Sequence, residues 1–258
     1  MSGPRTYVIG DVHGERALLT ALLAELPFVR PDDTLVFLGD YLDRGPDSRG
    51  VIELLRRLPE QTAGKVVCLR GNHEDALLKV VDGKDPSFLI PPGNGVLATY
   101  ASFTEQAPLA NLGALDKDGM TAYFDVDSWL PASVITWMRG LPLWWRDAHA
   151  IYVHAGLEGE GSVWAPPELS STTSLLWQRE PDFFTGYRGP PLVFGHTPVE
   201  DLPPPQPGRT APWRRGALFG LDTGAGKGGP LSCLELPAGK LIQAFPGGTV
   251  THAVVPLA

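Results

Sequence analysis

Residues 34–45 read Thr34-Leu-Val-Phe-Leu-Gly-Asp-Tyr-Leu-Asp-Arg-Gly45, an apolar run that stops at a glycine and continues as a polar loop. A short apolar run bounded in this way predicts a buried strand at 34–38. Similar runs at 7–9 and 65–69 predict strands before and after it. This spacing leaves room for a helix in each interval, and such strand–helix–strand units favour a parallel sheet with right-handed crossovers.

The intervals between these strands carry helical patterns. Leucines recur at helical spacing over 18–26, and apolar residues do so again over 51–58. Pro59 is expected to end the second of these helices, because proline disrupts a helix interior. A third helix is expected around 76–80, after the third strand.

The rest of the chain follows a different pattern. Residues from about 82 to 142 are expected to form an insertion of helices and loops. Strand-like runs then return with short links, which predict mixed or antiparallel pairing; they lie at 150–153, 192–194, 217–219, 231–236 and 241–245. Trp144-Trp145 is expected in the core or at a strand edge, and Pro203–Arg215 is expected to be a surface loop.

These patterns predict an α/β fold in which two mixed sheets pack as a sandwich flanked by helices. We find no internal repeat and no boundary, so residues 1–258 are expected to form a single domain. Cys68 and Cys233 lie in strand-like runs, where small buried thiols are expected rather than a disulfide.

The composition excludes some partners. A formal net charge of −8 argues against general attraction to nucleic acid. No apolar run approaches the roughly 20 residues that cross a bilayer, so no membrane partner is expected. Met1-Ser-Gly-Pro-Arg-Thr6 leads directly into the first strand, so we expect no signal peptide and a cytoplasmic location. The oligomeric state stays open.

Glycine-punctuated polar loops follow five of the predicted strands. Each loop alone has an ordinary explanation, such as a turn or, for Asn72, a helix N-cap. Five of them at strand ends indicate a shared site, because ligands gather at the carboxyl ends of strands in α/β sheets. The loops are Gly10-Asp-Val-His-Gly14, Gly39-Asp-Tyr-Leu-Asp-Arg-Gly45, Gly71-Asn-His-Glu74, His154-Ala-Gly156 and Gly195-His-Thr-Pro198.

The residue types in these loops suit metal ions. Carboxylate, imidazole and amide groups favour manganese, iron or zinc, and the positions of the cysteines exclude a thiolate site. Asp11 and His13 stand two residues apart on an extended segment and so project to the same side. Asp40 is the candidate to bridge two metals through its two oxygens.

Taken together, the loops resemble the signature motifs of the metal-dependent Ser/Thr phosphoprotein phosphatases of the calcineurin-like metallophosphoesterase superfamily. The resemblance is closest to the short bacterial and phage members. It extends through Leu176-Trp-Gln-Arg179 and Leu221-Asp-Thr-Gly-Ala225, and so covers most of the chain in order.

The resemblance implies a role for each matching residue. Two metal ions, manganese first with iron or zinc possible, would be held by Asp11, His13, Asp40, Asn72, His154 and His196. A hydroxide between them would attack phosphorus in line, without a phosphoenzyme. His73 would protonate the leaving oxygen, and Asp43 would orient that imidazole.

The remaining site residues are arginines and one aspartate. Arg44, Arg70 and Arg179 are expected to bind phosphate, with Arg188 as the rival of Arg179. Asp222 could orient a metal-bound histidine or, equally, cap a turn.

Three functions are compatible with this reading. The first is a Ser/Thr protein phosphatase, the second a hydrolase of dinucleoside polyphosphates such as diadenosine tetraphosphate, and the third a non-catalytic metal-binding scaffold. An acid and its orienting carboxylate, His73 and Asp43, speak against a scaffold. Asp43 and Glu74 favour the phosphatase, because the dinucleoside hydrolases are expected to have a small or apolar residue and an aspartate there. The segment at 82–142 is expected to form part of the pocket that selects the substrate, which is a phosphorylated protein or a small phosphoester.

Overall fold

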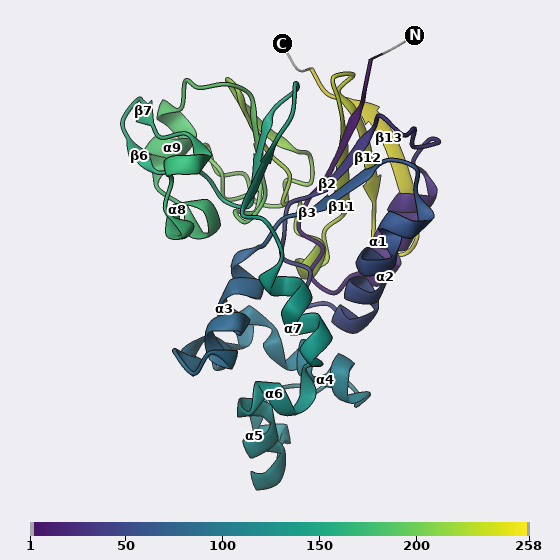
Figure 1. Cartoon of the computed structure of the whole chain (residues 1–258), viewed down its shortest axis with the longest axis vertical. Helices are drawn as coiled ribbons and strands as arrows, with labels where there is room; N and C mark the ends of the chain where they lie inside the picture. The colour runs from purple at the N-terminus through teal and green to yellow at the C-terminus, as the bar shows by residue number, and fades with distance from the viewer. Residues whose placement is uncertain (1–2, 257–258) are drawn as a thin grey trace.

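Two mixed β-sheets pack face to face in the computed structural model, which describes residues 3–256 (Figure 1). In the six-stranded sheet the order is β13 (Val250–Val254), β12 (Lys240–Ala244), β11 (Leu231–Leu236), β1 (Thr6–Ile9), β2 (Thr34–Phe37) and β3 (Lys65–Cys68). In the five-stranded sheet the order is β4 (Trp144–Arg146), β5 (Ile151–Val153), β8 (Leu192–Phe194), β10 (Leu218–Gly220) and β9 (Trp213–Arg215). The expected α/β sandwich is confirmed.

Each sheet combines three parallel strands with antiparallel ones, which form one side of the first sheet and both edges of the second. Strands β1, β2 and β3 run parallel, and β11 joins β1 antiparallel. In the other sheet β5, β8 and β10 run parallel, while β4 and β9 pair antiparallel at the edges. The carboxyl ends of three strands from each sheet are therefore available to build one site.

Alternating side chains explain how the layers pack. Val8 and Val36 point between the sheets and meet Tyr152 of the second sheet. Their neighbours Tyr7 and Phe37 point outward into the helices. All five side chains are essentially inaccessible to solvent. Because successive side chains of a strand point to opposite faces, both faces of these strands are buried.

Helices cover the outer faces of both sheets. The helices on the first sheet are α1 (Arg16–Ala24) and α2 (Ser48–Gln61), whereas α3 (Asn72–Val81) packs mainly against the helices of the segment that follows it. The second sheet is flanked by α8 (Thr172–Trp177) and α9 (Pro181–Gly186), next to the small hairpin of β6 (Gly159–Glu160) and β7 (Val163–Trp164). In the described residues no helix is both long and apolar enough to cross a bilayer.

The segment between α3 and β4 extends beyond the sheets, at the bottom of Figure 1. It holds α4 (Val96–Thr104), α5 (Lys117–Phe124), α6 (Val126–Trp129) and α7 (Ala132–Arg139), with 3₁₀ turns at Pro86–Leu89, Pro92–Asn94 and Leu112–Ala114. Further 3₁₀ turns are Pro167–Leu169 and Ala225–Lys227.

Two local predictions were wrong. Helix α2 continues through Pro59 to Gln61, because a proline in the last turn removes one hydrogen bond while the amide of Thr62 still reaches the Leu58 carbonyl at 3.1 Å. The expected loop Pro203–Arg215 ends in strand β9, which pairs with β10 through a two-residue turn at Gly216 and Ala217. Trp144 and Trp145 do lie on an edge strand, and both cysteines are free.

Candidate metal centre

Polar side chains gather where the parallel strands of both sheets end. Each of the six strands that run parallel is followed within four residues by one of them. Asp11 follows β1, Asp40 follows β2, and Asn72 follows β3 after a slightly longer link; His154, His196 and Asp222 follow β5, β8 and β10. These residues therefore lie together because the topology brings the carboxyl ends of these strands to one place.

One group of donors surrounds the side chain of Asn72. Its Oδ1 lies 2.8 Å from His154 Nε2 and 2.8 Å from His196 Nδ1. Because His154 Nδ1 lies 2.9 Å from the Leu38 carbonyl and must donate to it, Nε2 of the neutral ring presents a lone pair to the Asn72 oxygen. Two acceptors facing each other are unfavourable, and a bound cation would relieve that contact.

A second group forms around His13. The Nδ1 of this ring lies 2.8 Å from the Leu42 carbonyl, which again leaves Nε2 as an acceptor. Asp40 joins both groups, since its Oδ2 lies 3.4 Å from His13 Nε2 and its Oδ1 lies 3.4 Å from His154 Nε2. Such a carboxylate is positioned to bridge two metals.

The electrostatics of the site also fit metal ions. Burial lowers the pKa of His13, His154 and His196, which favours the neutral rings that ligate metals. Burial, aided by the charges of Asp222 and Asp40, raises the pKa of Asp11. Asp11 Oδ1 is buried and has no hydrogen-bond partner among residues 3–256. An orphaned carboxylate oxygen beside neutral imidazoles is what a cation would complete.

Two triads therefore emerge from the geometry. His13, Asp40 and His73 can bring ligand atoms within 4.8 Å of one another, as can Asp40, His154 and His196. The oxygen and imidazole donors suit manganese, iron or zinc. His73 belongs to the first triad by distance, but its other ring nitrogen has a different partner.

His73 forms a hydrogen-bonded chain with residues of two other elements. Its Nδ1 lies 2.6 Å from Asp43 Oδ2, and Asp43 Oδ1 accepts a 2.6 Å bond from the Thr99 hydroxyl on α4. Ser48 also contacts Thr99, at 3.0 Å. Burial alone would lower the pKa of His73, but the charges of Asp40 and Asp43 outweigh it and raise this pKa. His73 is thus the imidazole of the site that favours protonation.

Glu74 supports the backbone around Asp40. Its carboxylate accepts bonds from the amides of Asp40 at 3.0 Å, Tyr41 at 2.8 Å and Gly71 at 2.8 Å. A buried carboxylate in this position ties the loop after β2 to the loop after β3, which fixes Asp40 relative to Asn72.

The arginines do not all gather at the site. Arg44 contacts Nε2 of His13 and lies 3.2 Å from Nε2 of His73. Arg179 Nε donates to His196 Nε2 at 3.0 Å. Arg188, the rival of Arg179, instead donates to the carbonyls of residues 185 and 187.

Arg70 and Asp222 have other partners. The guanidinium of Arg70 donates to the Arg139 carbonyl at 2.7 Å and lies 3.6 Å from Asp75. Asp222 accepts the amide of Gly224 at 3.0 Å, which is the turn-capping alternative. Neither has a hydrogen bond to a ring of the four site histidines among residues 3–256.

Backbone strain concentrates at this site. In the described part of the chain six non-glycine residues have positive φ, and five of them are His13, Asp40, Asp43, Arg44 and His196. Such conformations cost about 1–3 kcal/mol each, and surrounding contacts must hold them. The clustering of strained residues identifies the site without reference to its metal-binding atoms.

Several contributors were not predicted. Thr99 and Ser48 belong to none of the sequence motifs, and Thr99 lies 56 residues from Asp43 in the sequence. Phe88 was missed as well, and Trp177 was noted only within its motif; the Phe88 ring lies 5.0 Å from that of His73, and the Trp177 ring lies 6.0 Å from that of His196. Glu74 was noted in its motif, but its three amide partners are visible only in the fold.

Comparison with known proteins gives a consistent picture. The sequence profile of the family described as calcineurin-like phosphoesterase matches residues 4–200. The symmetrical bis(5'-nucleosyl)-tetraphosphatase of Pectobacterium atrosepticum is 31% identical over 68% of this chain; the match covers 48% of that protein, so the chain spans about half of its length. The asymmetrical bis(5'-nucleosyl)-tetraphosphatase PrpE of Anoxybacillus flavithermus is 28% identical over 89% of both chains. Serine/threonine-protein phosphatase 1 of Salmonella typhimurium is 27% identical over 61% of this chain and 76% of its own.

Proposed function

The chain belongs to the calcineurin-like phosphoesterase family, and from that membership we propose that it is a metal-dependent phosphomonoesterase acting on phosphoserine and phosphothreonine in proteins. We assign Asp11, His13, Asp40, Asn72, His154 and His196 to two metal ions, with manganese as the expected metal. Bound there, the metals supply Lewis-acid charge neutralisation and an activated water.

The proposal of a phosphoprotein substrate rests on the pair of His73 and Asp43. An alkoxide leaves phosphorus poorly unless its oxygen is protonated as the bond breaks, whereas the nucleotide released from a dinucleoside polyphosphate leaves through a phosphate. A buried imidazole held at 2.6 Å by a carboxylate is suited to deliver that proton. This arrangement is most useful for serine and threonine esters.

Arg44 and Arg179 would bind the phosphoryl oxygens. Their guanidinium groups contact different histidines of the site: Arg44 contacts His13 and His73, and Arg179 contacts His196. Planar guanidinium forks match phosphate oxygens and neutralise charge in the transition state. The contacts of Arg70 support no such role for it, so we leave Arg70 out of the proposed phosphate site.

A second candidate is hydrolysis of dinucleoside polyphosphates. It is favoured by the similarity to the tetraphosphatase of Anoxybacillus flavithermus, which extends over 89% of both chains. The fold and the metal ligands would serve either substrate, so the two candidates differ in the leaving group.

One comparison separates the two candidates. A single manganese-loaded preparation is assayed with a phosphothreonine peptide and with diadenosine tetraphosphate, and we expect a higher kcat/KM for the peptide. A preference of ~100-fold for the dinucleotide, about 2.7 kcal/mol of differential transition-state binding, would contradict the phosphatase proposal.

The acid role has its own test. In His73→Asn, kcat should fall by roughly 10²–10⁴ for the phosphothreonine peptide and by much less for p-nitrophenyl phosphate, whose leaving group needs no proton. His252→Asn is the matched control, because this exposed histidine on β13 contacts Glu25, far from the site in sequence and fold. Equal losses on both substrates would contradict the assignment of the acid.

A further inference from the structure

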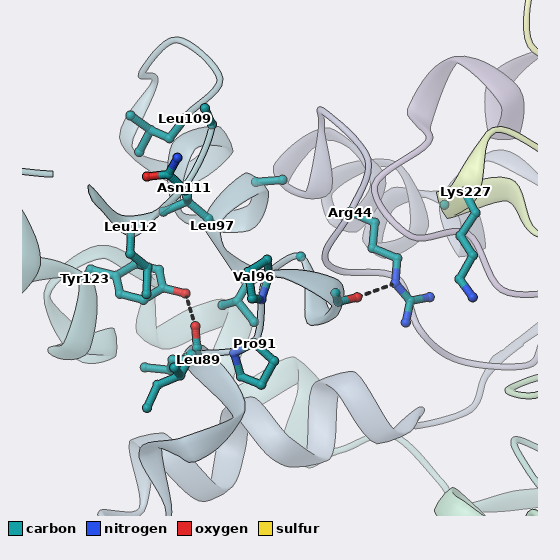
Figure 2. A pocket seen from close by; sticks show the side chains of 17 residues that line it. Arg44, Leu89, Pro91, Val96, Leu97, Leu109, Asn111, Leu112, Tyr123 and Lys227 are labelled. Atoms are coloured by element: carbon teal, nitrogen blue, oxygen red, sulfur yellow. Dashed lines mark hydrogen bonds between the residues drawn. The ribbon is translucent and has the colours of Figure 1, made fainter. Parts of the chain in front are cut away.

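A cavity of about 420 Å³ opens beside Arg44 (Figure 2). Figure 2 shows Arg44 and Lys227 together on one side of it, and Leu97, Leu109 and Leu112 on the other. The leucines come from the segment between α3 and β4. A cavity of this size is within the range of roughly 300–1,000 Å³ that is typical of ligand sites.

Arg44 joins this cavity to the metal centre. Its guanidinium contacts His73 at 3.2 Å, while its backbone amide and its Nε donate to the carbonyls of Gly95 at 3.1 Å and Gly93 at 3.4 Å. Gly226, beside Lys227, packs so closely that an added Cβ would lie 2.5 Å from the Cβ of His13. A group bound in the cavity would therefore lie close to His13 and His73 of the candidate metal centre.

The walls of the cavity are aliphatic. Leu89 and Val96 continue the surface formed by the three leucines. Tyr123 offers neither a ring face nor a free hydroxyl, because it is fully buried between Tyr100 and Phe124 and donates to the Leu89 carbonyl at 2.7 Å. Asn111 is the one side-chain amide in the lining.

This lining favours an aliphatic group over a nucleobase. A base carries several hydrogen-bonding atoms on its edge, and burying them without partners costs free energy. Among the described residues that line the cavity, a base would also find no open aromatic face on which to stack. An aliphatic side chain, by contrast, is stabilised by about 1.5–3 kcal/mol when it is fully buried.

The charge at the mouth favours an anionic substrate. Lys227 is exposed and has no carboxylate within ion-pairing distance among residues 3–256. With Arg44 it places two cations between the apolar walls and the site. A phosphorylated peptide that carries an aliphatic side chain near its phosphate complements both features.

We propose that this cavity binds an aliphatic side chain of the phosphoprotein substrate, a few residues from the phosphoserine or phosphothreonine. The proposal rests on the proposed phosphatase function and adds a sequence preference to it. It assigns Leu97, Leu109 and Leu112 as specificity-determining residues and Lys227 as a contact for nearby substrate anions.

The test uses a series of phosphothreonine peptides in which one leucine is moved along an otherwise alanine and glycine sequence. We expect kcat/KM for the peptide with its leucine at the favoured position to exceed that of the leucine-free peptide by about tenfold or more. In Leu112→Asn this ratio should approach one, and Leu97→Ala should reduce it as a second variant should the first fail to fold. Leu169→Asn is the matched control, because this exposed leucine lies outside the cavity and should leave the ratio unchanged.

The outcomes separate the two proposals. Hydrolysis of the peptides without a leucine preference, or a ratio that survives in Leu112→Asn and Leu97→Ala, would overturn the cavity assignment alone. Hydrolysis of p-nitrophenyl phosphate without hydrolysis of any phosphopeptide would overturn the phosphatase proposal and, with it, this one. Competitive inhibition by ADP that Leu112→Asn relieves would replace the aliphatic occupant with a nucleoside.

Discussion

The hydroxyl of Thr99 donates a 2.6 Å hydrogen bond to Asp43, whose other oxygen lies 2.6 Å from the ring of His73. Thr99 belongs to α4, in the segment that also lines the aliphatic cavity. The segment that would select the substrate thus contacts the residue that orients the proposed acid, which gives it a direct influence on catalysis.

We predict that Thr99→Val lowers kcat for a phosphothreonine peptide by about tenfold, because a hydrogen bond to a charged group contributes roughly 1.5–3 kcal/mol and part of this would fall on the orientation of Asp43. Steady-state kinetics with constant metal content checks it. Thr104→Val is the control, since that hydroxyl on the same helix donates to the Tyr100 carbonyl at 2.7 Å, within the helix and away from Asp43. Equal kinetics for Thr99→Val and Thr104→Val would refute the role of Thr99.

A substitution at Gly71 tests how tightly the carboxylate of Asp40 is packed. A Cβ at this position would lie 2.1 Å from Asp40 Oδ1 and 2.3 Å from the Asp40 amide nitrogen, so Gly71→Ala must displace Asp40. We expect metal content to fall by about half or more, with activity falling at least as far. Gly140→Ala should be neutral, because its nearest contact would be an ordinary 3.4 Å. Full metal content in Gly71→Ala would show that Asp40 is not held as described.

Asp33 gives a prediction about stability and pH away from the site. Burial alone would raise the pKa of Asp33, but hydrogen bonds from Arg30 and Arg5 outweigh it and hold this pKa well below its usual range. A depressed carboxyl pKa adds stability above the unfolded pKa of about 3.9, and this contribution is lost as pH falls toward the folded pKa.

We therefore expect Asp33→Asn to lower the free energy of unfolding at pH 7 by about 1–3 kcal/mol, a range that allows for the partly exposed arginines. The difference from the unchanged protein should shrink steadily below about pH 4. Urea unfolding at several pH values measures it. A difference that stays constant down to pH 2.5 would contradict the linkage, and Asp32→Asn, whose side chain is 54% exposed, provides the control.

The sequence predicted what depends on local pattern. Asp11, Asp40 and Asn72 could be assigned to one site because each follows an apolar strand, and strand ends of parallel units meet. The carbonyls of Leu38 and Leu42 that orient His154 and His13 could not be predicted, since backbone partners leave no signature in side-chain identity. The role of Thr99 could not be predicted either, because a threonine within a helix has no distinctive sequence pattern. It comes close to Asp43 only through the fold.

The errors have physical causes too. Pro59 is expected to end α2, but the helix continues to Gln61, because the missing amide hydrogen of a proline so near the end costs only one bond. The sequence predicts a loop where strand β9 forms, because three residues after a proline-rich stretch are too few to show the alternation typical of a strand. Its identity comes from pairing with β10.

The most direct test of the account is the metal content of the purified protein, measured by plasma mass spectrometry after loading with manganese and removal of free ions. The account predicts two metal ions per chain, and a loss of at least one of them in Asp40→Asn, because that carboxylate lies 3.4 Å from a ligand atom in each group. Less than one ion per chain in the unaltered protein, or two ions retained by Asp40→Asn, would contradict it.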